Sequence, residues 1–214
     1  PAGAAVPPNT SWCCSNITFV GPKLDAQFQN NADYITGGDM FPNNGSSLGR
    51  FQSAMQIRRN SHLNCYNSLV IGWPIGVMID NEKGNCWQAA KDQLINVQNV
   101  WLADCDLVGS DMNKQYKDSL ALDYKAKTFD PTAAHSFSTT WFLAQKGNQT
   151  KDFAALAMST TSYVPSASSP VLTAADFTAP ALKAMEQVSF LGACNADAAW
   201  LTGWTNFDPQ NTPY

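Results

Sequence analysis

The fold is decided by a stretch that reads MQIRRNSH at residues 55–62 and NSLVIGWPIGVMID at residues 67–80. A second stretch, LINVQNVWLADC at residues 94–105, repeats the pattern, so that Asn67 and Asn99 occupy equivalent positions. Short apolar runs rich in β-branched residues are typical of buried strands, and here Asn, Gly and Pro separate them. This succession of strand, sharp corner and strand predicts the coils of a solenoid, in which each turn buries its apolar side chains on its neighbours.

The two asparagines have a structural explanation in such a coil. Asn tolerates the left-handed backbone conformation, and stacked Asn side chains on successive turns satisfy each other's hydrogen-bonding groups. Gly72 and Pro74 flank Trp73 at the expected corner, where permissive or fixed φ angles allow a sharp change of direction. Alternate apolar residues of the runs are expected to point inward: Leu69, Ile71, Val77 and Ile79.

The composition narrows the class of protein. The chain is 44% hydrophobic and only 14% charged, with a net charge of −4, and Asn, Ser and Thr fill the polar positions. Such a surface favours an exported, sheet-rich protein over a cytosolic helical enzyme. Nucleic acid requires a clustered basic face, which the pair Arg58 and Arg59 does not supply. No apolar run of about 20 residues is present, so no membrane-spanning helix is predicted.

The cysteines predict disulfides, because an even number in an apparently exported chain fits an oxidising compartment. Cys65 and Cys105 lie at similar phases of neighbouring coils, and Cys86 is a candidate partner for either, so the pairing is left open. No Cys-x-x-Cys motif occurs and only two histidines are present, so neither a metal site nor a cofactor is predicted. The disulfide candidates are Cys13, Cys14, Cys65, Cys86, Cys105 and Cys194.

Two features of the chain relate to processing. It begins PAGAA without Met, which is expected of a processed or excised chain. The Asn-x-Ser/Thr sequons do not exceed the number expected by chance in a chain this rich in Asn, Ser and Thr, and they predict no origin. They begin at Asn9, Asn16, Asn44 and Asn148.

Parts of the sequence resemble a group of uncharacterised exported proteins of Bacteroidetes. The similarity lies in QIRRNS at residues 56–61, the run at residues 67–80, SPVL at residues 169–172 and WLTGWTNFDPQN at residues 200–211. It covers roughly residues 33–214. The resemblance implies a right-handed parallel β-helix and no settled activity, and the six cysteines depart from the usual members of the group.

The expected architecture is therefore all-β, a short right-handed parallel β-helix over residues 31–165. An extended N-terminal arm at residues 1–30 precedes it, and an irregular aromatic C-terminal cap at residues 166–214 follows. The arm is expected to cover the exposed edge of the first coil, unless another copy of the chain covers that edge head to tail. Residues 87–93 are expected to form a helical turn, and residues 139–143 a buried strand or the start of a helix.

The candidate ligand-binding residues are Arg58, His62, Asp104 and Trp73. Arginine binds carboxylates bidentately, but the favoured explanation of Arg58 is a tie to coil-end carbonyls or to a nearby Asp. Asp104 lies near Asp106 and Asp111, a group that would suit acid–base or calcium chemistry if it did not simply form turns. No nucleophile motif, P-loop or dinucleotide fingerprint is present, so no catalytic residue is assigned.

Two functions fit these observations. The leading prediction is a non-enzymatic structural or adhesive protein, extracellular or at the cell surface. It would self-assemble into a homo-oligomer or filament through the solenoid ends or the N-terminal arm. The alternative is a polysaccharide-binding or polysaccharide-degrading module that uses the face with Arg58, His62 and Asp104. Seven Trp residues support either function, since flat rings anchor interfaces and stack on sugars.

Overall fold

The structure of the chain is a computed structural model. It describes residues 8–24, 52–111, 118, 134–201, 203, 205–206 and 211–212. Residues 1–7 and 25–30 of the predicted arm therefore lie outside the described residues, as does the sequon at Asn44. No helix among the described residues combines the length and the apolar character needed to cross a membrane.

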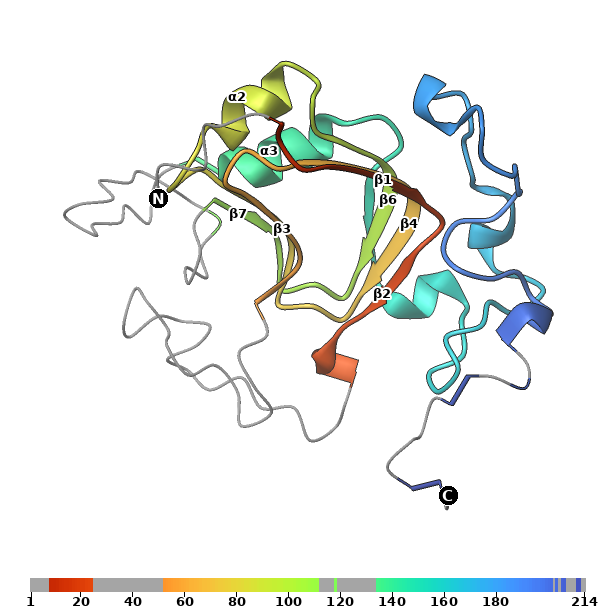
Figure 1. The fold of residues 1–214 in the computed structure, drawn as a ribbon. Coiled ribbons are helices and arrows are strands. Elements are labelled where there is room, and N and C mark those ends of the chain that lie inside the picture. Colours follow the sequence, from red (N-terminus) through yellow and green to blue (C-terminus); the bar gives the residue numbers. More distant parts are fainter. Residues whose placement is uncertain are drawn as a thin grey trace.

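Two parallel sheets form the body of the molecule (Figure 1). The first has the order β1–β4–β6–β8, and β2 pairs with β4 beyond the end of β1. Its strands are β1 (Ser11–Ser15), β2 (Thr18–Val20), β4 (His62–Ile71), β6 (Asn96–Ala103) and β8 (Gln149–Lys151). The second has the order β3–β5–β7, with strands β3 (Ser53–Arg58), β5 (Ile75–Asp80) and β7 (Leu107–Ser110).

The chain passes twice from the first sheet directly into the second, from β4 into β5 and from β6 into β7. At the first corner Gly72 has a φ of +66°, a conformation that glycine adopts without steric cost. The N–H of Gly72 donates to the carbonyl of Ala103 at 2.8 Å, so the corner also bonds to the neighbouring passage. The predicted corner at residues 72–74 is confirmed.

Two helices lie in the described parts of the connections between the sheets. The helix α2 (Cys86–Lys91) connects β5 to β6, so the predicted helical turn at residues 87–93 is confirmed. The helix α3 (Phe137–Ala144) precedes β8, which decides for a helix at residues 139–143. Figure 1 shows both helices at one end of the space between the sheets, opposite the corners. Short 3-10 helices are η2 (Pro22–Leu24), η3 (Phe153–Leu156), η4 (Pro170–Thr173), η5 (Pro180–Leu182) and η6 (Ala199–Leu201).

The prediction of an all-β right-handed parallel β-helix is wrong. The described residues are a mixture, 21% helical and 32% strand, and the two sheets do not close into a solenoid. The apolar runs were correctly taken as strands, but runs of this length do not determine what joins them. The strand β7 ends at Ser110, and just past that point Ile79 of β5 donates its N–H to Ser138 Oγ of α3 at 2.9 Å, so a helix takes the place of a continued strand.

The core lies between the sheets and holds Val77 and Ile79, as predicted. Leu69 and Ile71 are buried on the opposite face of the first sheet, so the prediction that they point inward is wrong. A strand that alternates without a break separates inward residues by an even number of positions. The left-handed φ of +48° at Asn67 shifts that alternation by one residue.

The outer face of the first sheet is covered by the C-terminal part of the chain. Phe153, Leu156, Val171 and Leu191 are buried there in one apolar cluster with residues of β4 and β6. In Figure 1 this segment, drawn in blue, runs along the outside of β4 and β6. The described part of the predicted arm is also part of the body, because it forms β1 and β2.

Candidate functional site

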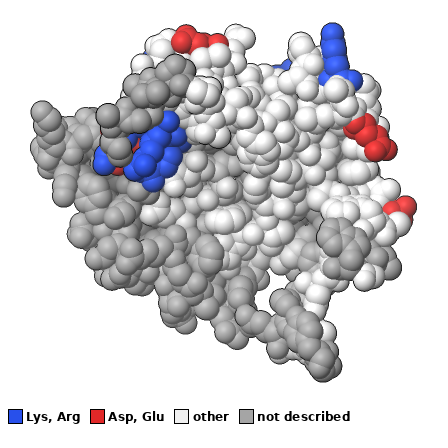
Figure 2. All heavy atoms as spheres, in the orientation of Figure 1, with Lys and Arg blue, Asp and Glu red and all other residues white. Residues whose placement is uncertain are grey.

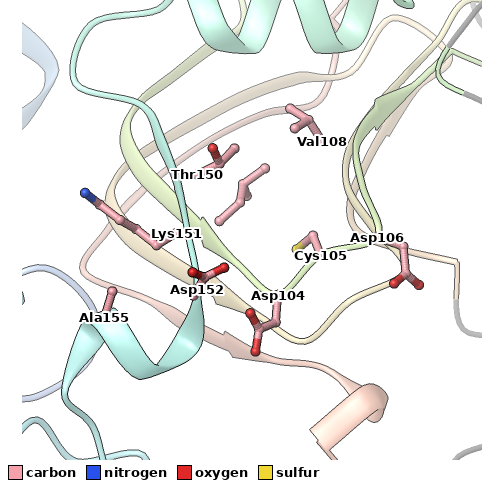
Figure 3. A pocket seen from close by; sticks show the side chains of 9 residues that line it. Asp104, Cys105, Asp106, Val108, Thr150, Lys151, Asp152 and Ala155 are labelled. Carbon is pink, nitrogen blue, oxygen red and sulfur yellow. The ribbon is translucent and has the colours of Figure 1, made fainter.

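One candidate site is an open cleft of about 530 Å³ at the edge of the two sheets that β7 and β8 form (Figure 3). Three segments meet there: the end of β6 with the corner that follows it, the start of β7, and β8 with η3. The described residues that line the cleft are Leu102, Asp104, Cys105, Asp106, Val108, Thr150, Lys151, Asp152 and Ala155.

Asp104 is held in place by the corner itself. Its φ of +50° places it in the left-handed region, which Asp tolerates better than most residues. Its N–H donates to the carbonyl of Lys151 at 3.2 Å, and its carboxylate accepts from the N–H of Phe153 at 3.0 Å. Asp104 therefore joins β6 to β8 and has a structural role at the cleft wall.

Asp106 is neutralised by a lysine from the far end of the chain. The Nζ of Lys23 lies 2.5 Å from Asp106 Oδ1 and also donates to the carbonyl of Asp104 at 2.9 Å. The pair is partly exposed, so its contribution to stability is small. The pair lowers the negative charge of the cleft, since Lys23 neutralises one of its three carboxylates, those of Asp104, Asp106 and Asp152.

The remaining polar groups of the cleft differ in availability. Burial raises the pKa of the Cys105 thiol to about 11, which keeps it protonated and a poor nucleophile at neutral pH. The exposed carboxylate of Asp152 has no hydrogen bond or ion pair with any residue that the structure describes. The Nζ of Lys151 lies over the Trp101 ring, 5.1 Å from its centre, outside the cleft. Figure 3 shows the Lys151 side chain directed away from Asp104 and Asp106.

The cleft is therefore open, polar on one wall and apolar at its base, where Leu102 and Val108 contact the core. Hydroxyl and carboxylate groups of this kind bind neutral polar ligands such as sugars through hydrogen bonds. Among the described residues, no group of three His, Cys, Asp or Glu is placed to hold a metal ion.

Arg58 lies at the end of β3, far along the chain from the cleft. Its Nε is 3.6 Å from Asp80 Oδ2, which is too long for a hydrogen bond but close enough for an ion pair. Asp80 is almost fully buried, and burial raises its pKa despite this cation. Arg58 is therefore tied to a nearby Asp, Asp80, as one of the two explanations from the sequence had it.

His62 is the first residue of β4 and pairs with Ser11 of the edge strand β1. It lines a smaller, mostly apolar cavity of about 230 Å³ between the edge strands β1 and β3. Its Nε2 is 3.5 Å from the side-chain amide of Asn9. The other described lining residues are Thr10, Trp12, Phe19, Ala54, Met55, Gln56, Ile57, Ser61 and Leu63.

Trp73 occupies the corner between β4 and β5. Its Nε1 donates to the carbonyl of Phe19 at 3.3 Å, and its ring packs against the core between the sheets. The structure thus distributes Arg58, His62, Asp104 and Trp73 over separate places: of these four residues the cleft contains Asp104 alone, and the smaller cavity contains His62 alone.

Asp111 is also separated from Asp104 and Asp106. Its buried carboxylate accepts hydrogen bonds at the start of α3, from the N–H of Phe137 at 2.7 Å, the N–H of Ser138 at 2.7 Å and the Ser138 hydroxyl at 2.5 Å. Its role is to satisfy the free N–H groups of the helix N-terminus.

Sequence reasoning missed the residues that β8 and η3 contribute to the cleft, among them Thr150 and Asp152. One signal was present. The pairing of β6 with β8 places Gly147 opposite Asn99, and Gly147 has a φ of +74°. After Asn67 and Asn99, a third left-handed residue therefore lies at the same position, just before β8. The interval of 48 residues between Val100 and its partner Asn148 obscured it, because the two earlier passages are 32 residues apart.

Comparison of the chain with protein-family models, with curated proteins and with solved structures finds no match. The resemblance to exported proteins of Bacteroidetes therefore stays a prediction.

Proposed function

We propose that the chain is a structural or adhesive protein, extracellular or at the cell surface, that associates head to tail through the edges of its two parallel sheets. The observation that carries this proposal is that the two sheets have the same direction of strand order, and therefore different strands at their two edges. Among the described residues, both sheets begin with an edge strand at one side, β1 with β2 and β3, and both end at the opposite side, β8 and β7.

Parallel pairing makes the two edges complementary. All strand pairs in both sheets run parallel, so a second copy shifted along the stacking direction presents its β1 and β3 to β8 and β7 of the first copy in the same direction. Such a contact uses different surfaces on the two copies. It therefore does not close on itself and extends into a filament.

The side chains at the edges support the same contact. Trp12 of β1 is 53% exposed and Val20 of β2 is 39% exposed, and both lie on edge strands. Large apolar side chains at an unpaired edge favour association, whereas charged ones oppose it. Figure 2 shows a face on which charged residues are sparse among the described atoms. That sparseness, with the low charged fraction of the whole chain, supports an exported protein.

The test compares two matched variants of the purified chain by light scattering over a range of concentrations and by electron microscopy. Val20→Lys places a charge on an edge strand, and Leu94→Lys places the same charge on a loop residue of similar exposure, 48%, outside both edges. We expect concentration-dependent growth for the wild type and for Leu94→Lys, and loss of growth for Val20→Lys. A wild type that stays monomeric at every concentration contradicts the proposal.

The cleft of about 530 Å³ favours a second candidate function, binding or cleavage of a polysaccharide. Asp152 is the acidic group that remains available there. Binding of neutral and acidic polysaccharides, measured by calorimetry, should weaken in Asp152→Ala and stay unchanged in Glu186→Ala, an exposed acid of the C-terminal segment. No binding by the wild type would exclude this candidate and leave the head-to-tail proposal untouched.

A further inference from the structure

Two cysteines lie directly opposite each other on neighbouring strands of the first sheet. Cys14 of the edge strand β1 is the register partner of Cys65 on β4. Both side chains belong to the core cluster between the sheets, so they point to the same side. Adjacent strands lie about 4.7–4.9 Å apart, which falls within the range of about 4.4–6.8 Å between Cα atoms that a disulfide joins.

The Cys14 and Cys65 side chains act on each other. Their interaction lowers the pKa of the Cys65 thiol, and together with burial it raises the pKa of the Cys14 thiol. A disulfide between them needs no change in strand register, because the two residues are already paired.

The other cysteines have different surroundings. Cys13 is exposed and pairs in register with Asn64. On its other side Cys65 pairs with Val97 of β6. Cys105 lies in the cleft at the opposite edge of the sheets. The register therefore singles out one pair, which the spacing of the cysteines in the sequence did not indicate.

We propose that Cys14 and Cys65 form a reversible disulfide that joins the edge strand β1 to β4. All six cysteines are free thiols in the structure, which is the reduced state of this pair. The oxidant is a low-molecular-weight disulfide. The small disulfide reaches Cys14, which retains 8% exposure where Cys65 has none. The raised pKa of Cys14 keeps its thiolate fraction small, so its attack on the disulfide is slow at neutral pH and faster at higher pH. The attack forms a mixed disulfide and releases one small thiol.

Cys65 completes the reaction. Its thiolate attacks the Cys14 sulfur of the mixed disulfide, forms the Cys14–Cys65 bond and releases the second small thiol. The two protein thiols together lose two electrons and two protons, which the small disulfide takes up. The cross-link lies within one chain, so this inference does not depend on the head-to-tail association.

The test is peptide mapping of the folded chain after incubation with oxidised glutathione. Trypsin separates the cysteines, because Cys65 is the only cysteine of residues 60–83, and Cys13 and Cys14 share residues 1–23. We expect one cross-linked species, residues 1–23 joined to residues 60–83, that reduced glutathione or dithiothreitol returns to the two separate peptides.

Variants identify the sulfur atoms. The cross-link should persist in Cys13→Ser and disappear in Cys14→Ser, and oxidation should raise the thermal unfolding midpoint of Cys13→Ser but not of Cys14→Ser. Cys14→Ala provides the same comparison if the serine disturbs the core. Linkage of Cys65 to any other peptide, loss of the link in Cys13→Ser, or no link in the folded wild type overturns the proposal.

Discussion

The side-chain amide of Asn99 donates a hydrogen bond of 2.8 Å to the side-chain oxygen of Asn67, 32 residues earlier in the chain. Both residues have left-handed backbones, with φ of +54° and +48°. The same Asn67 oxygen accepts from the N–H of Asp176 at 2.8 Å, and the Asn67 carbonyl accepts from the N–H of Gly192 at 2.9 Å. The asparagine stack therefore joins the two strands and also attaches the C-terminal segment to the sheet.

Replacement of Asn67 by Ala should lower the free energy of unfolding by about 3 kcal/mol, measured by urea denaturation. The change leaves the N–H of Asp176 without its acceptor and removes one of the two acceptors of the Asn99 amide, which keeps the carbonyl of Ala174. It also places a Cβ-bearing residue that lacks Asn's local hydrogen bonds in a left-handed conformation. Asn67→Gly should cost about 1 kcal/mol less, because glycine adopts that conformation freely.

Asn64 provides the matched control, since it also lies on β4 and accepts from an asparagine of β6, Asn96, at 2.7 Å. It is only half-buried and has no left-handed backbone. Asn64→Ala should therefore cost about 1 kcal/mol or less. Equal losses in Asn64→Ala and Asn67→Ala would show that the left-handed stack has no special role.

The asparagine stack shows how much of the fold the sequence contained. Asn67 and Asn99 recur in strands of the same composition, and a repeated sequence spacing places equivalent residues side by side on parallel strands. The sequence did not show which side chains of β4 point into the core. An unbroken strand separates such residues by an even number of positions, but Cys65 and the next apolar residue that points into the core, Val70, are five positions apart. Only a backbone that leaves the extended region at Asn67 explains an odd interval, and no sequence pattern reports φ directly.

The candidate site was less accessible to sequence reasoning than the strands. Asp104 and Asp106 do line the cleft, whereas Asp111, a few residues further on, caps α3. Proximity in sequence did not separate these roles, because the strand β7 lies between Asp106 and Asp111 and places Asp111 at the start of α3. Asp152 directly follows β8, a strand that pairs with β6 across a long sequence interval, and such long-range contacts leave no local periodicity to detect.

Asp111 should be a strong determinant of stability. Asp111→Ala removes the acceptor of two helix N–H groups and of the Ser138 hydroxyl, so we expect a loss of about 3 kcal/mol in the free energy of unfolding. Asp152→Ala, at an exposed acid without such partners among the described residues, should change it by less than about 0.5 kcal/mol. A similar small effect of Asp111→Ala would contradict the assigned role.

Two aspartates should give opposite dependences of stability on pH. Burial raises the pKa of Asp80, so its stabilising contribution is fully present below the pKa of the unfolded chain and is lost as the pH rises through the folded value. The loss caused by Asp80→Asn, relative to the wild type, should therefore be larger at pH 4 than at pH 7. Urea midpoints across this range measure it.

Asp176 provides the opposite case. Its hydrogen bond with Lys146, at 2.6 Å, lowers the pKa of Asp176 to about 2, so its contribution is present above the unfolded value and is lost as the pH falls towards 2. The effect of Asp176→Asn should be larger at pH 7 than near pH 2, and modest throughout because the pair is exposed. Parallel pH profiles for Asp80→Asn and Asp176→Asn would contradict both assignments.

Cys105 should resist alkylation in the folded chain. Because its pKa is raised to about 11, its reaction with iodoacetamide at pH 8 should be far slower in the folded chain than in the chain unfolded in urea. In the folded chain the rate should rise about tenfold per pH unit up to about pH 11.

The charged residues beside Cys105 provide two control variants with opposite expected effects. Lys23 lowers the pKa of Cys105 and Asp106 raises it, so Lys23→Met should slow the reaction and Asp106→Asn should accelerate it. Mass spectrometry of the tryptic peptide 92–114 measures each rate, because Cys105 is its only cysteine. If Cys105 reacts equally fast in the folded and unfolded chain at pH 8, the fold does not shield its thiol and the raised pKa is contradicted.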